Sequence, residues 1–416
     1  MALALRLRAS GFEPVIAAAE YYRSKVEAEG LGFAPMRPDF EDIERDLGID
    51  ATEGIRRMIE GNSFILEKVL FPSLAAAYED VMRATADADL ILTSNLAFGA
   101  RLAAEKRGLP HLEAAFQPAL FLSAYDPPEL GPYPWLARLP RRLGPLGANA
   151  LFGLVRGVAA SWAEPVHRFR RELGLPSTRD NPIFDANPAS LGTLALYSSL
   201  MGDVQPDFPA RTALVGFTFY DSESGGRPQL PAELEAFLAA GSPPLVFSLG
   251  STAVLRGEAF YRDSLAAARR LGERAVILVG SDQVERWKGR TGPEVFVGGY
   301  APHSLLFPRA RAIAHHGGMG TTAQAIRAGR PQLVVPFMAD QPDNAARLVR
   351  LGVARTIPHL SYSAKRAASE LRALVSQPTY EAAAARAAAV VAGEDGAGEA
   401  VRIIEETLRR RAAQVV

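Results

Sequence analysis

The sequence predicts an α/β protein of two domains, each built on a parallel β-sheet with helices on both faces. A length of 416 residues with 48% hydrophobic content is enough for two or three compact domains. Short apolar strands alternate with helices in both halves, which is the pattern of parallel sheets. The polar stretch DSESGGRPQLP separates the halves. We therefore predict a first domain at residues 1–220, a linker at 221–231, a second domain at 232–398, and a helix at 399–416 that crosses back to the first domain.

The first half begins with a helix, whereas a doubly wound domain normally begins with a strand and a ligand-binding turn. Apolar runs between Gly and Pro breaks predict strands at residues 13–18, 33–36, 89–93, 111–115, 195–197 and 212–217. Helical spacing of apolar residues predicts helices at residues 2–9, 21–30, 55–85, 98–107 and 151–173. The acidic stretch 39–50 has too few apolar residues to predict an element.

Residues 116–145 differ in character from the rest of the first half. Seven prolines alternate there with Phe121, Tyr125, Tyr133 and Trp135. One interpretation is a long excursion packed by its own aromatic side chains. The other is an acceptor pocket, because long loops often carry binding sites and apolar pockets are lined by such residues.

The second half repeats the alternation of strands and helices. We predict strands at residues 245–248, 275–279, 295–297 and 333–336, and helices at residues 259–271 and from 365 onward. At its centre, residues 310–344 read as a strand, a Gly-rich turn, a helix that ends at Gly329, and a second strand. Two halves of similar architecture imply two Rossmann-like domains that face a central cleft.

Composition limits the function classes. Lys plus Arg and Asp plus Glu are equal at 46 each, so no overall charge favours nucleic acid or an anionic membrane. The chain contains no cysteine, which excludes disulfides, thiolate metal sites and a cysteine nucleophile and is compatible with a cytoplasmic location. We expect no transmembrane segment, because no apolar run approaches about 20 residues; peripheral contact with a membrane stays open.

Four clusters in the second half carry candidate chemistry. Gly250, Ser251 and Thr252 follow a strand and could present N–H and hydroxyl groups to a phosphate. The turn at residues 299–303 offers an aromatic ring and a rigid Pro, suited to stacking on a base. In HHGGMGTT, the start of a helix favours an anion and an imidazole could donate to a diphosphate oxygen. The Asp-Gln pair after the next strand suits vicinal sugar hydroxyls.

Together these clusters resemble a known family. HHGGMGTT, GRPQLVVPFMADQPDNAARLVRLG and YAPHSLLFPRA are similar to the donor-binding region of family 1 nucleotide-sugar glycosyltransferases, which have the GT-B fold. SNLAFGARLAAEKRGLPHL and LVFSLGSTAVLRGEAFY resemble the bacterial rhamnosyltransferases that form rhamnolipids and the macrolide and antibiotic glycosyltransferases. The resemblance implies an inverting transfer of a sugar from a UDP- or dTDP-sugar to a hydroxyl of a hydrophobic acceptor, with no cofactor and no metal.

The resemblance also implies roles for individual residues. The nucleobase contacts would come from Tyr300, Ala301 and His303, and the sugar contacts from Asp340 and Gln341. The diphosphate would be held by Ser251, Thr252, His315, Gly318, Met319, Gly320 and Thr321.

The sequence departs from the family pattern at its start. Relatives carry the general base on a loop after their first strand, so we expect that base before Met1. His111 and His167 are the candidate substitutes within the chain. Two alternatives to a transferase stay open: a donor-binding homologue that is catalytically impaired or assists a partner, and a GT-B epimerase or hydrolase that acts on the sugar nucleotide.

Overall fold

The chain forms two compact units. The computed structural model describes residues 1–49, 53–54, 57, 63–131, 134–222, 226–250 and 257–415. Unit 1 comprises Met1–Pro128, Tyr133–Tyr220 and Asp395–Val416, and unit 2 comprises Glu129–Pro132 and Asp221–Glu394. The chain therefore passes from unit 1 to unit 2 at the first residue of the predicted linker.

Unit 1 contains two parallel sheets. Its strands are β1 (Val15–Ala18), β2 (Gly32–Pro35), β3 (Ile91–Ser94), β4 (His111–Ala115), β5 (Thr193–Ala195) and β6 (Thr212–Leu214). The first two strands pair with each other, and the other four form a sheet in the order β3-β4-β5-β6. The parallel pairing predicted for this half is confirmed.

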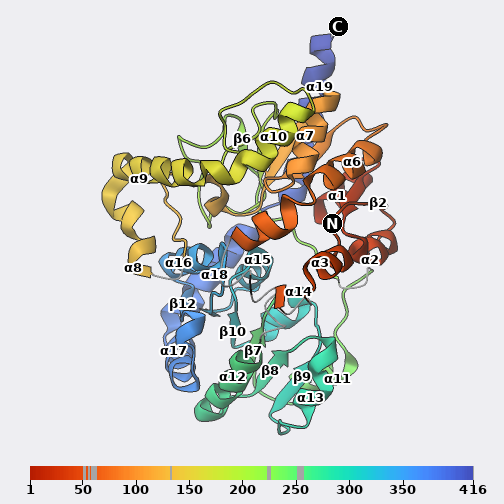
Figure 1. Cartoon of the computed structure of the whole chain (residues 1–416). Helices are drawn as coiled ribbons and strands as arrows, with labels where there is room; N and C mark the ends of the chain where they lie inside the picture. The colour runs from red at the N-terminus through yellow and green to blue at the C-terminus, as the bar shows by residue number, and fades with distance from the viewer. Residues whose placement is uncertain are drawn as a thin grey trace. The chain divides into compact units, whose positions relative to one another are not determined.

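The helices of unit 1 are α1 (Ala2–Ala9), α2 (Arg23–Ala28), α3 (Phe40–Leu47), α5 (Ser63–Ile65), α6 (Leu74–Ala84), α7 (Phe98–Arg107), α8 (Pro134–Ala137), α9 (Leu139–Val158), α10 (Glu164–Glu172) and α19 (Gly396–Val415). Of these, α2 and α6 pack beside the β1–β2 pair, and α7 packs beside β3 and β4 (Figure 1). Shorter helical turns are η1 (Glu20–Tyr22), the π-helical η2 (Leu66–Leu70), η3 (Pro118–Phe121) and η4 (Ala159–Ala163). The predicted helix at residues 55–85 lies partly outside the described residues.

The two terminal helices belong to the same unit. Helix α19 packs beside α1, and Ala400 and Ile404 join the core that contains Leu112 and Leu194 of the central strands. The predicted return of the C-terminal helix to the first domain is confirmed, although the helix begins at Gly396.

Three helices, α3, α8 and α9, differ from the predictions. Residues 39–50 contain α3, whose N-terminus is closed by a reciprocal capping box between Asp39 and Asp42. The segment 116–145 is not one irregular excursion, because α8 and the first part of α9 occupy its second half. Prolines suggested a loop there, yet Pro140 lies in the first turn of α9, where a missing N–H costs nothing.

Unit 2 is a single six-stranded parallel sheet. Its strands are β7 (Leu245–Ser248), β8 (Ala275–Leu278), β9 (Val295–Gly298), β10 (Ala312–His315), β11 (Gln332–Val334) and β12 (Ala354–Thr356), the last of which was not predicted. The order β12-β11-β10-β7-β8-β9 is that of the doubly wound fold, in which the winding reverses between β7 and β10.

Helices cover both faces of this sheet (Figure 1). They are α11 (Ala232–Ala239), α12 (Glu258–Leu271), α13 (Val284–Lys288), α14 (His303–Leu306), α15 (Met319–Arg327), α16 (Gln341–Arg350), α17 (Ala364–Ser376) and α18 (Pro378–Ala392). Alternate residues of one strand enter different cores: Phe247 packs with α12 and α17, and Val246 with α11, α14 and α15. Burial on both faces explains the continuous apolar strands of the sequence.

Candidate functional site

The carboxyl ends of β7 and β10 lie side by side in unit 2. The two strands are parallel neighbours, with Ser248 opposite His315. After them the chain continues through Gly250 on one side and through His316, Gly317 and Gly318 on the other. Ligands of doubly wound sheets bind outside the strand ends at this reversal of winding. The Gly-rich turn predicted from the sequence therefore lies where the fold places a ligand.

His316 is held between two glycines at this edge. Its Nδ1 accepts a hydrogen bond from the backbone N–H of Gly250 at 3.1 Å. A Cβ atom on Gly250 would lie 2.6 Å from the ring carbon Cε1, and one on Gly318 would lie 2.3 Å from Nε2. Such distances are sterically forbidden, so the ring requires glycine at both positions. Burial, with smaller effects of His315 and His303, lowers the pKa of His316 to about 3. The neutral ring then carries its proton on Nε2.

His315 has a different environment. It is completely buried, its Nδ1 accepts from the N–H of Gly317 at 3.1 Å, and its Nε2 lies 3.0 Å from Oε1 of Gln332. Burial lowers the pKa of His315 to about 4. The neutral ring therefore uses both nitrogens within the protein, which leaves neither for the diphosphate contact predicted for this residue.

The turn leads directly into α15. Gly317 has a φ of +89°, which favours glycine, and a Cβ there would lie 2.8 Å from Val334. Gly318 is the N-cap of α15 and offers no side-chain oxygen to the first N–H groups. Met319 is half-buried, Gly320 is exposed and Thr321 is buried. The uncapped N–H groups and the positive end of the helix dipole make this turn suited to an anion.

Asp340 and Gln341 lie at the start of α16 and are linked to the same turn. Oε1 of Gln341 accepts from the N–H groups of Phe337 and Met338 at 2.8 and 3.1 Å, so its amide N–H₂ group is directed elsewhere. Burial raises the pKa of Asp340, opposed by hydrogen bonds from its own backbone and from Asn344. Both residues keep polar atoms that could contact a sugar hydroxyl.

Asn344 was missed by the sequence analysis. Its buried amide donates to Oδ2 of Asp340 at 2.6 Å and to the carbonyl oxygen of Gly317 at 2.9 Å. The four-residue spacing from Asp340 places both side chains on one face of a helix, which was a usable signal. Asn344 thus joins the start of α16 to the glycine turn.

The turn after β9 is anchored by Asp221. Its Oδ1 accepts from the hydroxyl of Tyr300 at 3.2 Å and from the N–H of His303 at 3.0 Å, and its Oδ2 accepts from the N–H of Ser304. Ala301 is completely buried and Tyr300 is half-buried. The sequence analysis placed Asp221 in the linker because of the composition of that stretch. No sequence pattern indicated that its side chain anchors this turn.

The ring of His303 connects this turn to the strand ends. It stacks on Phe307 with ring centroids 4.2 Å apart, and its Nε2 lies 3.5 Å from Oγ of Ser248 at the end of β7. Burial lowers the pKa of His303 to about 4, opposed by Asp221. Ser251 and Thr252, the other predicted diphosphate contacts, lie outside the described residues.

The two candidate bases lie in unit 1. His111 is 2% exposed at the amino end of β4, and its Nε2 is 2.7 Å from Oγ1 of Thr93. Burial, together with the charge of Arg101, lowers the pKa of His111 to about 4. Ligands bind at the other end of parallel strands, so this position favours a structural role.

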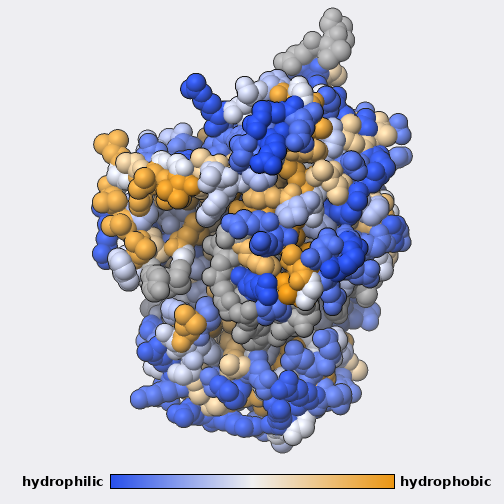
Figure 2. Space-filling model, viewed as in Figure 1, coloured by the Kyte–Doolittle hydropathy of each residue, from blue (hydrophilic) through white to orange (hydrophobic). Residues whose placement is uncertain are grey.

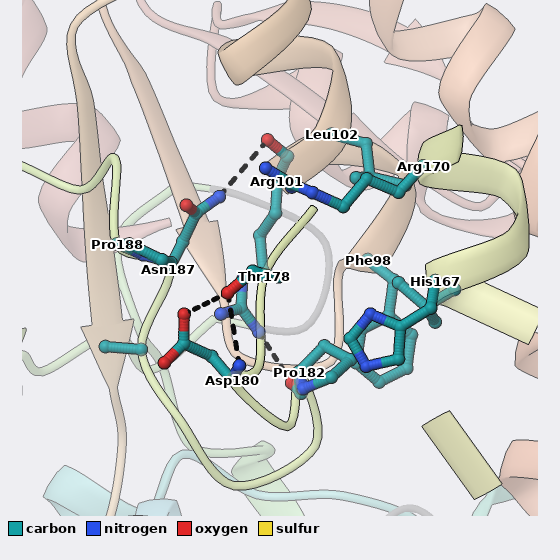
Figure 3. Close-up of a pocket in the computed structure, with 12 residues that line it drawn as sticks. Phe98, Arg101, Leu102, His167, Arg170, Thr178, Asp180, Pro182, Asn187 and Pro188 are labelled. Atoms are coloured by element: carbon teal, nitrogen blue, oxygen red, sulfur yellow. Dashed lines mark hydrogen bonds between the residues drawn. The ribbon is translucent and has the colours of Figure 1, made fainter. Parts of the chain in front are cut away.

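His167 lies on α10 and lines a cavity of about 40 Å³ (Figure 3). Arg101, Thr178, Asp180 and Asn187 line the same cavity. A volume of this size holds a few water molecules, so His167 does not face a space large enough for a natural-product acceptor. Within the described part of the chain, no group of three His, Asp or Glu side chains is arranged to hold a metal ion.

Comparison with known proteins places this geometry in a family. A family described as "Erythromycin biosynthesis protein CIII-like, C-terminal domain" matches residues 264–407. O-mycaminosyltylonolide 6-deoxyallosyltransferase of Streptomyces fradiae is 33% identical over 437 residues, covering 99% of this chain and 94% of that protein. Vancomycin aglycone glucosyltransferase of Amycolatopsis orientalis is 29% identical over 429 residues, covering 99% and 94%.

Solved structures share the fold. Glycosyltransferase VinC in complex with dTDP superimposes with a TM-score of 0.68 at 22% identity, covering 98% of this chain and 95% of VinC. Spinosyn rhamnosyltransferase SpnG complexed with thymidine diphosphate gives a TM-score of 0.65 at 19% identity, covering 97% and 95%. The chain therefore belongs to the macrolide and antibiotic glycosyltransferases of family 1: it is a sugar-transferring enzyme with the GT-B fold.

Proposed function

We propose that this glycosyltransferase moves a sugar from a dTDP- or UDP-sugar to a hydroxyl group of a hydrophobic natural product, with inversion at the anomeric carbon and without a metal ion. One observation carries the proposal. The ring of His316 is fixed between Gly250 and Gly318 directly before the uncapped N-terminus of α15. Fixed donors at that point suit the diphosphate of a nucleotide sugar.

In the proposed reaction, the acceptor oxygen attacks the anomeric carbon opposite the departing nucleoside diphosphate. Negative charge grows on the diphosphate as the bond to the sugar breaks. The N–H groups at the start of α15 and Nε2–H of His316 stabilise that charge, and they need no reorganisation because the structure already holds them in place. The resemblance implied a diphosphate contact for His315. We assign this contact to His316.

The sugar and the base are assigned to the neighbouring turns. Asp340 accepts hydrogen bonds from sugar hydroxyls, and the amide N–H₂ of Gln341 donates to them; the fixed Oε1 of Gln341 supports this orientation. Tyr300 stacks on the pyrimidine, with Ala301 and His303 beside it. The thymidine diphosphate named for VinC and SpnG supports a dTDP-sugar over a UDP-sugar.

The acceptor is proposed from the relatives. The names of two relatives, an O-mycaminosyltylonolide deoxyallosyltransferase and a vancomycin aglycone glucosyltransferase, support a natural-product acceptor. The general base that takes the acceptor's proton is not assigned to a described residue, because His111 is buried and His167 faces a small cavity. A cytoplasmic location, where nucleotide sugars are made, stays a prediction.

The experiment has two parts. Thermal unfolding is measured with dTDP, UDP and a panel of their sugars, since a ligand that binds only the folded state raises the melting temperature. Release of the nucleoside diphosphate is then measured with and without macrolide aglycones. Stabilisation by a dTDP-sugar and acceptor-dependent release support the proposal. Release at the same rate without an acceptor would indicate a hydrolase and contradict the transferase mechanism.

A further inference from the structure

Helices α8 and α9 and the turn η4 expose a row of large apolar side chains. This apolar stripe consists of Trp135, Leu143, Leu146, Leu154, Val158 and Trp162. Leu146 is 89% exposed, and Trp135, Leu154 and Val158 are each exposed by about two thirds or more. Figure 2 shows hydrophobic residues gathered over α8 and α9. A continuous exposed apolar area of this kind marks an interaction surface.

The opposite face of α9 holds the stripe rigidly on unit 1. Ala148 and Phe152 are buried and pack with Leu122, Ala124 and Phe184. Leu154, Val158 and Trp162 follow one another at four-residue intervals, which places neighbouring members side by side on the helix surface, and Leu146 lies eight residues before Leu154. The stripe is therefore a fixed outer surface of a helix whose inner surface is already packed.

The segment that carries the stripe is basic. Residues 134–163 contain Arg138, Arg141, Arg142 and Arg156 and no acidic residue, although acidic and basic residues balance over the whole chain. Asp126 pairs with Arg141 at 2.8 Å and Asp185 lies 3.6 Å from Arg156, so these two aspartates offset part of the charge and the net charge stays positive. A tryptophan lies near each end of this segment. Arginine beside exposed leucine and valine, with tryptophans at the ends, is the composition of a helix that lies in a lipid interface.

The segment does not have the geometry of a membrane-spanning helix. The stretch Trp135–Glu172 is long and apolar enough to cross a bilayer by length and composition, which the sequence analysis did not foresee. However, Gly144 has a non-helical φ of 67° and ψ of 178° and is followed by Pro145, which breaks α9 near its start. One side of α9 also packs on protein.

We propose that the apolar stripe and its arginines bind the surface of an anionic phospholipid bilayer. The net positive charge of this face favours an anionic membrane over a second copy of this chain. Two copies docked through the face would bring two positively charged surfaces together, whereas phosphate headgroups neutralise that charge. The stripe enters the headgroup region with α9 parallel to the surface, and unit 1 stays outside the bilayer.

The test uses flotation of the full chain with vesicles of phosphatidylcholine alone and of phosphatidylcholine mixed with phosphatidylglycerol. The wild-type chain is expected to float with the mixed vesicles, less in high salt, and poorly with phosphatidylcholine alone. The double variant L146E/L154E should bind at least about ten-fold more weakly, because two leucines no longer enter the lipid. R142E should weaken binding at least about five-fold.

Matched control variants show whether a loss of binding comes from the apolar stripe or from added negative charge in general. L360E changes a leucine that is 83% exposed in unit 2, and R372E changes an exposed arginine of α17. Both should float like the wild type. Circular dichroism and stabilisation by dTDP check that each variant is folded and binds the nucleotide as the wild type does.

Three results would overturn the proposal. The first is absence of wild-type binding to mixed vesicles, and the second is equal binding by L146E/L154E and the wild type. The third is a wild-type dimer that ignores vesicles and becomes a monomer in L146E/L154E, because this assigns the stripe to a second copy of the chain.

Discussion

The backbone N–H of Gly250 donates to Nδ1 of His316 over 3.1 Å and so joins the loops that follow β7 and β10. Because Nδ1 accepts this bond, the ring proton lies on Nε2, the nitrogen next to Gly318. Glycine at position 318 leaves space in front of Nε2, where a side chain would otherwise lie. The contact thus sets both the tautomer of His316 and the access of a ligand to its proton.

Replacement of His316 by alanine should lower kcat/KM about 10²–10³-fold, the usual cost of losing one donor to a developing negative charge. The fold should persist, because removal of the ring gives up the hydrogen bond from the N–H of Gly250, a loss of about 1 kcal/mol. His315→Ala is the matched comparison: it should lower the free energy of unfolding by about 1–3 kcal/mol, because Gln332 and Gly317 lose a buried partner. Steady-state kinetics and chemical unfolding separate the two effects. A larger loss of kcat/KM in well-folded His315→Ala would reverse the assignment.

Gly318→Ala should weaken donor binding without removing any hydrogen-bonding side chain. The added Cβ would lie 2.3 Å from Nε2 of His316, so either the ring or the turn must move. Gly153→Ala is the control, since a Cβ there meets no atom within 4 Å in α9. Titration calorimetry with dTDP should show weaker binding only for Gly318→Ala. Equal affinities for the two variants would mean that the ring is not confined as described.

Asp340→Asn should show whether Asp340 contacts the sugar or supports the binding of the nucleotide. We expect a higher KM for the nucleotide sugar, because the amide accepts hydrogen bonds more weakly than a carboxylate. Free dTDP lacks the sugar and should bind the variant and the wild type alike. Kinetics with the sugar donor and calorimetry with dTDP measure the two quantities. If the affinity for free dTDP falls equally, Asp340 supports the diphosphate turn through Asn344 and does not read the sugar.

The conformational stability of the chain should fall as the pH drops below about 6.5. Folding depresses the pKa values of His303 and His315 to about 4 and of His316 to about 3. The unfolded chain therefore takes up protons first, and each histidine removes about 1.4 kcal/mol per pH unit until the folded pKa is reached. Above the unfolded pKa, this contribution is fully present. Guanidinium unfolding at several pH values measures the slope, and His315→Gln should reduce it. A midpoint that does not change between neutral pH and pH 5 would contradict these buried neutral rings.

Asp221→Ala should weaken nucleotide binding through the turn that carries Tyr300. The carboxylate accepts from Tyr300, His303 and Ser304, and its loss leaves three donors without that partner. We expect smaller stabilisation by dTDP in a thermal-unfolding assay, with weaker discrimination between dTDP and UDP. Asp282→Ala, which changes an exposed carboxylate of the same unit, is the control. Unchanged stabilisation by dTDP in Asp221→Ala would exclude this positioning role.

The strands and the glycine turn were predictable because their causes are local. Continuous apolar runs such as the one at β7 arise where both faces of a sheet are buried, and glycine at position 317 is required by a positive φ. The beginning of α9 was not predicted, because its prolines suggested a loop: Pro140 lies in the first turn, where a helix tolerates proline, and Pro145 follows the break at Gly144. Strand β12 was missed because ART is short, and only pairing with β11 makes it a strand.

The sequence by itself determined the α/β class, the alternation that builds a doubly wound unit 2, and the motif HHGGMGTT that points to a nucleotide-sugar site. It did not distinguish His315 from His316, since adjacent residues of the same type carry the same chemistry. Only the tertiary structure separated them: Gln332 and Gly317 occupy the ring nitrogens of His315, and Gly250, 66 positions before His316, fixes the ring that keeps a proton for a ligand. Hydrogen bonds between residues distant in sequence depend on the packing of strands, and no local pattern encodes them.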